Sequence, residues 1–347
     1  MAKETIAQTA TETTRTPPQA RLRALSSSSS SFALRLITDY GIIVAFIIEV
    51  AAFALIAPRF FTFSNGINVA LQVAITGILA AGMTMVILTG GIDLSVGSVV
   101  ALTGVLSAFL MKAGLISPAL DLLIVIAVAV AVGACFGAFS GLAVSKLNFP
   151  PFVVTLALMT ICRGIAFIMT DGFSVGDLPS TFNYLGQGHI GPVPVLVIIM
   201  AVIFILSHVV LTRTRFGRYV YAVGSNEQAS YLSGINTSQV KTAVYIINGA
   251  LVGLGGVALA SRLGAGVPSS GQFYELDVIA AVVVGGTSLS GGKGSVVGSF
   301  WGTVFIGVLN NGLNLRNVDP YRQRIVLGVV ILLAVMLDRL KPSLKRD

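Results

Sequence analysis

Few residues in this sequence could carry chemistry, and the strongest candidate is a glycine-rich stretch with one lysine, GGTSLSGGKG at residues 285–294. A nucleotide-binding P-loop needs a glycine five residues before the glycine that precedes the lysine, and Ser or Thr after the lysine. Those positions hold Thr287 and Gly294, so the motif fails at both. No catalytic triad or metal-ligand pattern occurs elsewhere in the sequence. We therefore expect neither ATP hydrolysis nor another enzyme activity from this chain.

Charged side chains inside apolar runs are a second set of candidates, because a charge at the centre of a bilayer costs about 2.5–3.5 kcal/mol on insertion scales. Asp93 follows a Gly-Gly break and lies two residues before Ser95. It either caps the helix expected from Val96, with Ser95 sharing that role, or serves a polar path through the membrane. Arg163 and Glu49 lie well inside apolar runs, where each either forms a structural ion pair or lines a cavity.

Asparagines within apolar stretches supply neutral hydrogen-bonding groups. In membrane helices such residues either hydrogen-bond to a neighbouring helix or line a path for a polar solute. Both interpretations stay open for the four that we single out: Asn248, Asn310, Asn311 and Asn314.

The elements that position these residues are predicted to be membrane helices. Hydrophobic residues make up 55% and charged residues 10% of the chain, and the mean hydropathy is +0.90. A soluble domain could not bury that much apolar surface. We expect the net charge of +8 to follow from basic cytoplasmic loops and not from a nucleic-acid partner. The two cysteines lie in apolar runs and form no disulfide or metal pattern.

Ten apolar segments divide the chain, with a predicted disordered cytoplasmic tail at residues 1–36, a transmembrane domain at 37–341 and a cytoplasmic tail at 342–347. Ten crossings place both termini in the cytoplasm, and fifteen Lys and Arg residues then lie inside against six outside. The run at 276–289 is short for a span and is predicted to be broken or re-entrant. The segments are 40–57, 67–89, 96–113, 120–144, 152–170, 194–211, 242–261, 276–289, 296–313 and 323–340.

Two loops stand out between these segments. The loop at 171–193 is either a docking surface for an extracytoplasmic partner or a plain surface loop. The polar stretch at 213–241, here called the elbow, has helix signals at both ends. Ser225 and Gln228 have the spacing of a capping box, Gly234 is expected to end the short helix in left-handed geometry, and Asn236 or Ser238 can cap the next helix. Such an elbow is predicted to contact a partner outside the membrane.

Two glycine-rich stretches echo each other, GGIDLSVGSVV at 90–100 and GGTSLSGGKGSVVG at 285–298. Internal repeats in transporters usually flank the substrate path. A parallel repeat would place both turns on the cytoplasmic side, as the count of crossings does, whereas an inverted repeat would place them on opposite sides. The sequence leaves both arrangements open.

These two stretches, the elbow segment GSNEQASYLSGI, and SFWGTVFIGVLNNGLNL after the second turn resemble the ribose-type family of sugar ABC-importer permeases, from about residue 32 to 340. The family elbow reads roughly G-x-N-x-x-A-A-x-x-S-G-I, and Ser230 replaces its second alanine. The resemblance implies an all-α polytopic subunit in the cytoplasmic (inner) membrane of a bacterium, importing a ribose-like pentose or other monosaccharide. ATP and Mg²⁺ would be used by a separate cytoplasmic ATPase, and this chain would bind no cofactor.

Further partners implied are a periplasmic sugar-binding protein, a second copy of the chain or a paralogous permease, and membrane lipid, with no nucleic acid. The rivals are import of another small polar solute, a secondary transporter, which would need a relay of membrane carboxylates or histidines, and a channel, which would need no elbow. The expected ATPase-coupling residues are Gly224, Asn226, Glu227, Ala229, Ser233, Gly234 and Ile235. The expected residues of the substrate path are Asp93, Ser95, Arg163, Asn248, Asn310 and Asn311.

Overall fold

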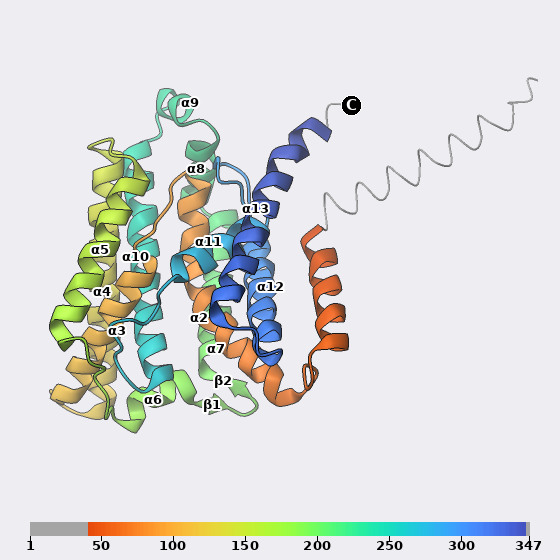
Figure 1. The fold of residues 1–347 in the computed structure, drawn as a ribbon. Helices are drawn as coiled ribbons and strands as arrows, with labels where there is room; N and C mark the ends of the chain where they lie inside the picture. The colour runs from red at the N-terminus through yellow and green to blue at the C-terminus, as the bar shows by residue number, and fades with distance from the viewer. Residues whose placement is uncertain (1–40, 345–347) are drawn as a thin grey trace, which may run out of the picture.

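A computed structural model describes residues 41–344 of the chain as a bundle of helices (Figure 1). The predicted tail at 1–36 lies outside the described residues, and the predicted tail at 342–347 begins within the last helix. After a helix at Gly41–Ile56, the elements are α2 Phe63–Leu88, α3 Val96–Ala113, α4 Pro118–Ser145, α5 Pro151–Thr170, α6 Ser180–Gln187, β1 His189–Ile190, β2 Val193–Pro194, α7 Val195–Arg213, α8 Arg215–Ser225, α9 Glu227–Leu232, α10 Thr237–Leu263, α11 Tyr274–Val284, α12 Val296–Leu315 and α13 Pro320–Leu344.

The fold is almost entirely helical, and its strands form one short hairpin in which His189 pairs with Pro194 and Ile190 with Val193. Within the described residues, seven helices are long and apolar enough to cross a membrane: α2, α3, α4, α5, α7, α10 and α12. The helix at Gly41–Ile56 is apolar but shorter. Each of the ten predicted segments overlaps one helix, and α3 has the predicted bounds.

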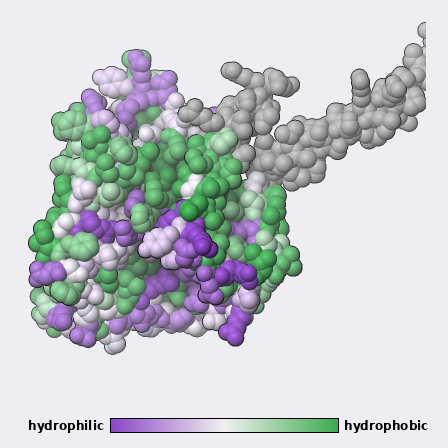
Figure 2. Space-filling model, in the orientation of Figure 1, coloured by the Kyte–Doolittle hydropathy of each residue, from purple (hydrophilic) through white to green (hydrophobic). Residues whose placement is uncertain are grey.

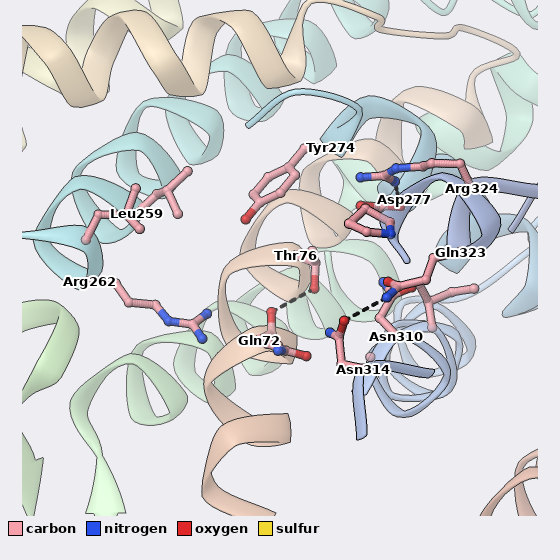
Figure 3. Close-up of a pocket in the computed structure, with 14 residues that line it drawn as sticks. Gln72, Thr76, Leu259, Arg262, Tyr274, Asp277, Asn310, Asn314, Gln323 and Arg324 are labelled. Carbon is pink, nitrogen blue, oxygen red and sulfur yellow. Dashed lines mark hydrogen bonds and ion pairs between the residues drawn. The ribbon is translucent and has the colours of Figure 1, made fainter. Parts of the chain in front are cut away.

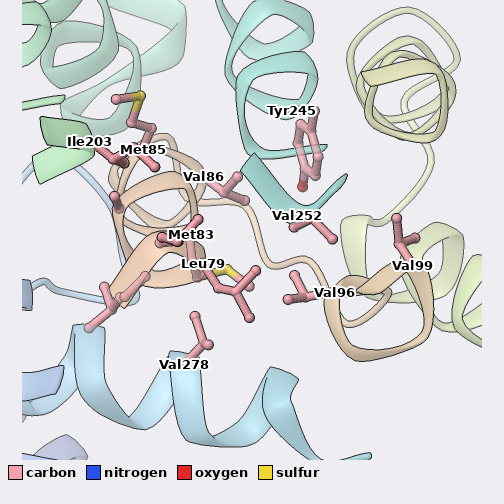
Figure 4. Packing of buried hydrophobic residues seen from close by; sticks show 14 of the residues in the cluster. Leu79, Met83, Met85, Val86, Val96, Val99, Ile203, Tyr245, Val252 and Val278 are labelled. Atoms are coloured by element: carbon pink, nitrogen blue, oxygen red, sulfur yellow. The ribbon is translucent and has the colours of Figure 1, made fainter. Parts of the chain in front are cut away.

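Glycines let the central helices pack backbone against backbone. A Cβ added at Gly133 of α4 would lie 2.1 Å from the Gly249 oxygen of α10, and one at Gly253 would lie 2.1 Å from the Ala129 oxygen. Such close approach is how helices associate in lipid, where the hydrophobic effect does not drive them together. Around this contact the side chains of α2, α3, α10 and α11 fill a buried apolar cluster that includes Leu79 and Val278 (Figure 4).

Two helices each begin after a non-helical stretch of chain. Residues 89–95 lead from α2 into α3, and residues 264–273 lead from α10 into α11. α11 has 11 residues, so at about 1.5 Å per residue it spans roughly half of a bilayer core of about 30 Å. The predicted broken element is therefore present. The second stretch packs against the first turn of α3, where a Cβ at Gly97 would lie 2.2 Å from the Gly271 oxygen.

α2 ends and α10 begins at the end of the bundle that carries α8 and α9, so these two helices run in opposite directions (Figure 1). Two units therefore have the same order of elements, a long helix, a non-helical stretch and a second helix. The first unit is α2, residues 89–95 and α3, and the second, in the opposite orientation, is α10, residues 264–273 and α11. Antiparallel units of this kind are what an inverted repeat would produce. The glycine-rich echo in the sequence instead relates the stretch before α3 to the turn between α11 and α12, and both of these lie at the α8–α9 end.

Candidate functional site: the elbow and the polar groups of the bundle

The elbow consists of two short helices, α8 and α9, at one end of the bundle (Figure 1). Asn226 separates them and caps α9, because its Oδ1 accepts a hydrogen bond from the Ala229 amide at 2.8 Å. The predicted capping box was therefore wrong by one residue. Ser225 ends α8, and its hydroxyl donates to the Tyr221 carbonyl oxygen at 2.8 Å.

The far end of the elbow has the predicted geometry. Gly234 follows α9 with a φ of +83°, in the left-handed region that glycine adopts without a steric penalty. Of the two candidate caps for the next helix, Asn236 is the one used, since its Oδ1 accepts from the Gln239 amide at 3.0 Å. Glu227 and Lys241 close the elbow with an ion pair at 2.5 Å.

The predicted coupling residues lie together along this elbow, from Gly224 at the end of α8 to Ile235 after α9. Ile235 packs against the main core, while Tyr231 and Leu232 at the tip are 69% and 77% exposed. Exposed apolar side chains on a small polar element form a surface suited to a protein partner.

Beneath the elbow lies a contact that we call the glycine joint, formed by Leu88, Gly90, Gly224, Gly291 and Gly292. A Cβ at Gly224 would lie 1.7 Å from the Leu88 oxygen and 2.6 Å from the Gly292 nitrogen. The Gly292 amide donates to the Leu88 carbonyl oxygen at 2.9 Å. A Cβ at Gly291 would lie 3.0 Å from the Gly90 nitrogen. Three backbones therefore touch here: the end of α2, the end of α8, and the turn between α11 and α12.

One side chain reinforces the joint. Tyr221 of α8 donates from its hydroxyl to the Gly294 carbonyl oxygen at 3.0 Å. Burial raises the pKa of this hydroxyl, so Tyr221 stays protonated and remains a donor. The two glycine-rich stretches that echo each other in the sequence thus meet on the same face of α8.

Asp93, Ser95 and Asn248, three predicted path residues, form one buried cluster. Asp93 Oδ1 accepts from the Ser95 amide at 2.9 Å and from the Ser95 hydroxyl at 2.6 Å, and Asp93 Oδ2 accepts from Asn248 Nδ2 at 2.8 Å. Ser95 occupies the cap position of α3 but makes no side-chain capping bond. Asp93 therefore fixes the turn before α3 and ties it to α10.

Arg163 lies elsewhere, on α5, and forms no ion pair among the described residues. Its Nη1 donates to the carbonyl oxygens of Pro268 and Ser270, each at 2.7 Å. It thereby holds the stretch at 264–273 that leads into α11. Glu49 is buried on the helix Gly41–Ile56, and neither of its carboxylate oxygens has a hydrogen-bond partner in the described part of the chain.

The neighbouring residues Asn310 and Asn311 of α12 face different surroundings. Asn311 pairs reciprocally with Asn65 of α2 through two hydrogen bonds of 2.9 Å, so it joins two helices. Asn310 faces a cavity of about 400 Å³ between α2, α10, α11, α12 and α13 (Figure 3). The structure thus separates the predicted path residues into four places: the Asp93 cluster, Arg163, the Asn311 pair, and Asn310 in the cavity.

Most polar residues of this cavity were not predicted from the sequence, which pointed only to Asn310 and Asn314 as candidates for a path. The lining includes Gln72, Thr76, Arg262, Tyr274, Asp277, Asn310, Asn314, Gln323 and Arg324. Spacing carried a signal: Gln72 and Thr76, and Asn310 and Asn314, are each four residues apart, which places each pair on one face of its helix. A pair of polar residues on one face of each of two apolar helices, α2 and α12, could have indicated a polar cavity between them.

Comparison with known proteins places the chain in a family. Residues 65–335 match the family described as branched-chain amino acid transport system / permease component. The ribose import permease protein RbsC of Escherichia coli K12 is 43% identical over 303 residues, covering 86% of this chain and 93% of that protein. The RbsC of Bacillus subtilis is 44% identical over 305 residues, covering 87% and 93%.

Permeases with other named sugars are also similar. The D-allose transport system permease protein AlsC of Escherichia coli K12 is 38% identical over 323 residues, covering 92% of this chain and 98% of that protein. The L-arabinose permease AraH of the same strain is 35% identical over 318 residues, covering 91% and 95%. No solved structure matches the chain significantly. The chain therefore belongs to this permease family, as a transport subunit of the ribose-type ABC importers in the inner membrane, and is not an enzyme.

Proposed function

We propose that this permease moves a monosaccharide, a ribose-like pentose in the first place, inward across the cytoplasmic membrane. The similar permeases are named for ribose, allose and arabinose, which are all neutral polyhydroxylated solutes. The observation that carries the mechanism is the glycine joint. It connects an elbow with an exposed apolar tip to the ends of helices that cross the bundle.

A cytoplasmic ATPase would bind the elbow and supply the energy, using ATP and Mg²⁺ at its own site. Because a partner shifts an equilibrium between two states only by its different affinity for them, the ATPase must grip the elbow differently in its two states. This assignment puts α8 and α9 in the cytoplasm, with ten crossings and both termini on that side. The positive-inside count supports this orientation.

At the opposite end, α6 and the β1–β2 hairpin would receive the sugar-binding protein (Figure 1). This region is held firmly on α10, because the Gly186 amide donates to the Ser261 hydroxyl at 2.6 Å. Its surface carries the exposed side chains of Phe173, Tyr184 and Ile190. A firmly held, partly apolar surface suits a partner that docks and leaves repeatedly.

A second permease copy, identical or paralogous, would cover one side of the bundle. Hydrophilic side chains interrupt the hydrophobic band in the middle of the face shown in Figure 2, near α11 and the start of α13. Polar groups at membrane depth are tolerated where protein or water covers them, and not where lipid does. A second subunit facing this side would enclose a polar path between the two copies.

The test is uptake by the permease reconstituted in liposomes with its ATPase and binding protein. ATP-dependent accumulation of labelled ribose is expected, with allose and arabinose as competitors. Uptake driven by a proton or sodium gradient without ATP would show a secondary transporter, and passive equilibration without partners would show a channel. Accumulation of leucine in preference to every sugar would contradict the proposed substrate class.

A further inference from the structure

We propose that the cavity between α2, α10, α11, α12 and α13 is a binding site in which the permease holds one neutral monosaccharide during its passage. This proposal rests on the proposed function and assigns it a place in the chain. The cavity measures about 400 Å³, within the range of about 300–1,000 Å³ that is usual for small-molecule sites. It lies at the end of the bundle away from the elbow.

Unused hydrogen-bonding capacity is the first argument. The side chains of Gln72 on α2, Tyr274 on α11 and Asn310 on α12 line the cavity, and all three are half-buried. None of them has a side-chain hydrogen-bond partner in the described part of the chain. Figure 3 shows the Gln72 and Tyr274 side chains reaching into the same space from different helices. Half-buried amides and a phenol without partners are the groups that a polyhydroxylated ligand would satisfy.

The charges of the cavity are the second argument, and they count against a ligand with an ammonium group. Asp277, the acidic residue of the lining, accepts from Arg324 Nη1 at 2.7 Å. Arg262, the other cation of the lining, donates to the Leu71 carbonyl oxygen at 3.1 Å. An amino-acid ligand would need a free carboxylate for its ammonium group, whereas the lining carboxylate already has its cation. Tyr274 adds an aromatic ring of the kind that packs against apolar faces of ligands.

Continuity with the elbow is the third argument. α2 has Leu88 at its end in the glycine joint, and Gln72 and Thr76 in the cavity. α12 begins beside the joint and has Asn310 in the cavity. α11 contributes Tyr274 and packs on α12 so closely that a Cβ at Gly302 would lie 1.9 Å from the Ala281 oxygen. Three of the five lining helices therefore run from the joint to the cavity, so a displacement of the elbow would change the cavity's shape.

Transport kinetics of Gln72→Leu and Asn310→Leu test the site. An external binding protein would capture the sugar before the permease does, so the half-saturating sugar concentration should stay unchanged. The maximal rate of ribose uptake should fall about fivefold for each variant, corresponding to the loss of one ordinary hydrogen bond. Thr160→Val is the matched control, since Thr160 is exposed on α5 outside the cavity and its hydroxyl bonds only to its own helix. Equal maximal rates in all three variants would overturn the proposal while leaving the proposed function intact.

Thiol labelling gives a direct second readout that does not depend on transport. Asn310→Cys is introduced together with Cys135→Ala, so that the exposed Cys135 cannot contribute to the labelling. In the assembled complex, a water-soluble thiol reagent should modify Cys at 310, and millimolar ribose should slow the modification while leucine does not. Equal rates with and without ribose would overturn the site. Protection by leucine alone would overturn the sugar assignment, and with it the proposed function.

Discussion

Gly224→Ala should uncouple the permease, because position 224 has no room for a methyl group. The added carbon would lie 1.7 Å from the Leu88 carbonyl oxygen, whereas real Cβ atoms essentially never come closer than 3.0 Å to another heavy atom. The backbones of α8 and α2 would have to separate by about 1.3 Å. The Gly292 nitrogen, 2.6 Å from the same carbon, blocks a sideways escape.

The magnitude follows from what this separation breaks. Overpacking in a close-packed contact costs about 1–3 kcal/mol. The hydrogen bond from the Gly292 amide to the Leu88 carbonyl oxygen, 2.9 Å long, lies in the same contact, and losing it costs about 1 kcal/mol more. A loss of this size should loosen the joint without unfolding the bundle, whose main apolar cluster lies around α2, α3 and α10.

The assay is the number of sugar molecules accumulated per ATP hydrolysed by the reconstituted complex. Gly224→Ala should insert and assemble, yet its transport per ATP should fall at least about tenfold. Gly164→Ala is the control, because a Cβ at Gly164 meets nothing within 4 Å. Wild-type coupling in Gly224→Ala, with the ATPase bound, would refute the reasoning that the joint transmits the movement.

Three further substitutions probe other contacts. Gly234→Val forces a β-branched residue into a φ of +83°, which costs about 1–3 kcal/mol. The variant complex should either hydrolyse ATP without taking up sugar, or lose its ATPase during purification. Arg163→Leu removes the guanidinium group that donates to the Pro268 carbonyl oxygen, and it should lower the rate of sugar uptake at normal expression. An unchanged rate of uptake would show that the stretch before α11 needs no such anchor. Asn311→Leu leaves Asn65 buried without its partner, at about 1–3 kcal/mol, and should lower the thermal unfolding temperature in detergent, with partial recovery when both become Leu.

The sequence predicted the helices well because hydropathy is local. Val96–Ala113 coincides with α3, and the short run at 276–289 overlaps the half-length α11. At the elbow, the left-handed Gly234 was predicted correctly, because glycine after a short helix has few other roles. The cap before α9 was misplaced by one residue. Ser225 and Asn226 are both good caps, and only the contact of α8 with the turns beneath it decides where α8 ends.

The cavity could not be predicted in the same way, because its residues come from five helices. Tyr274 and Arg324 are 50 positions apart, and Arg324, expected in an outside loop, lies on the first turns of α13, where it pairs with Asp277. The buried cluster of Asp93 and Asn248 is likewise a contact between distant segments. Hydropathy identifies polar residues in apolar helices, but only the packing of those helices shows which of them face each other.

The central claim is that the elbow is where the ATPase docks, and photo-cross-linking tests it most directly. A photoreactive amino acid is placed at Leu232, 77% exposed on α9, or at Ile190, 60% exposed on the hairpin at the opposite end. In the assembled complex, the probe at position 232 should cross-link to the ATPase, and the probe at 190 should not. Capture of the ATPase from position 190 and not from 232 would contradict both the docking site and the orientation of the chain in the membrane.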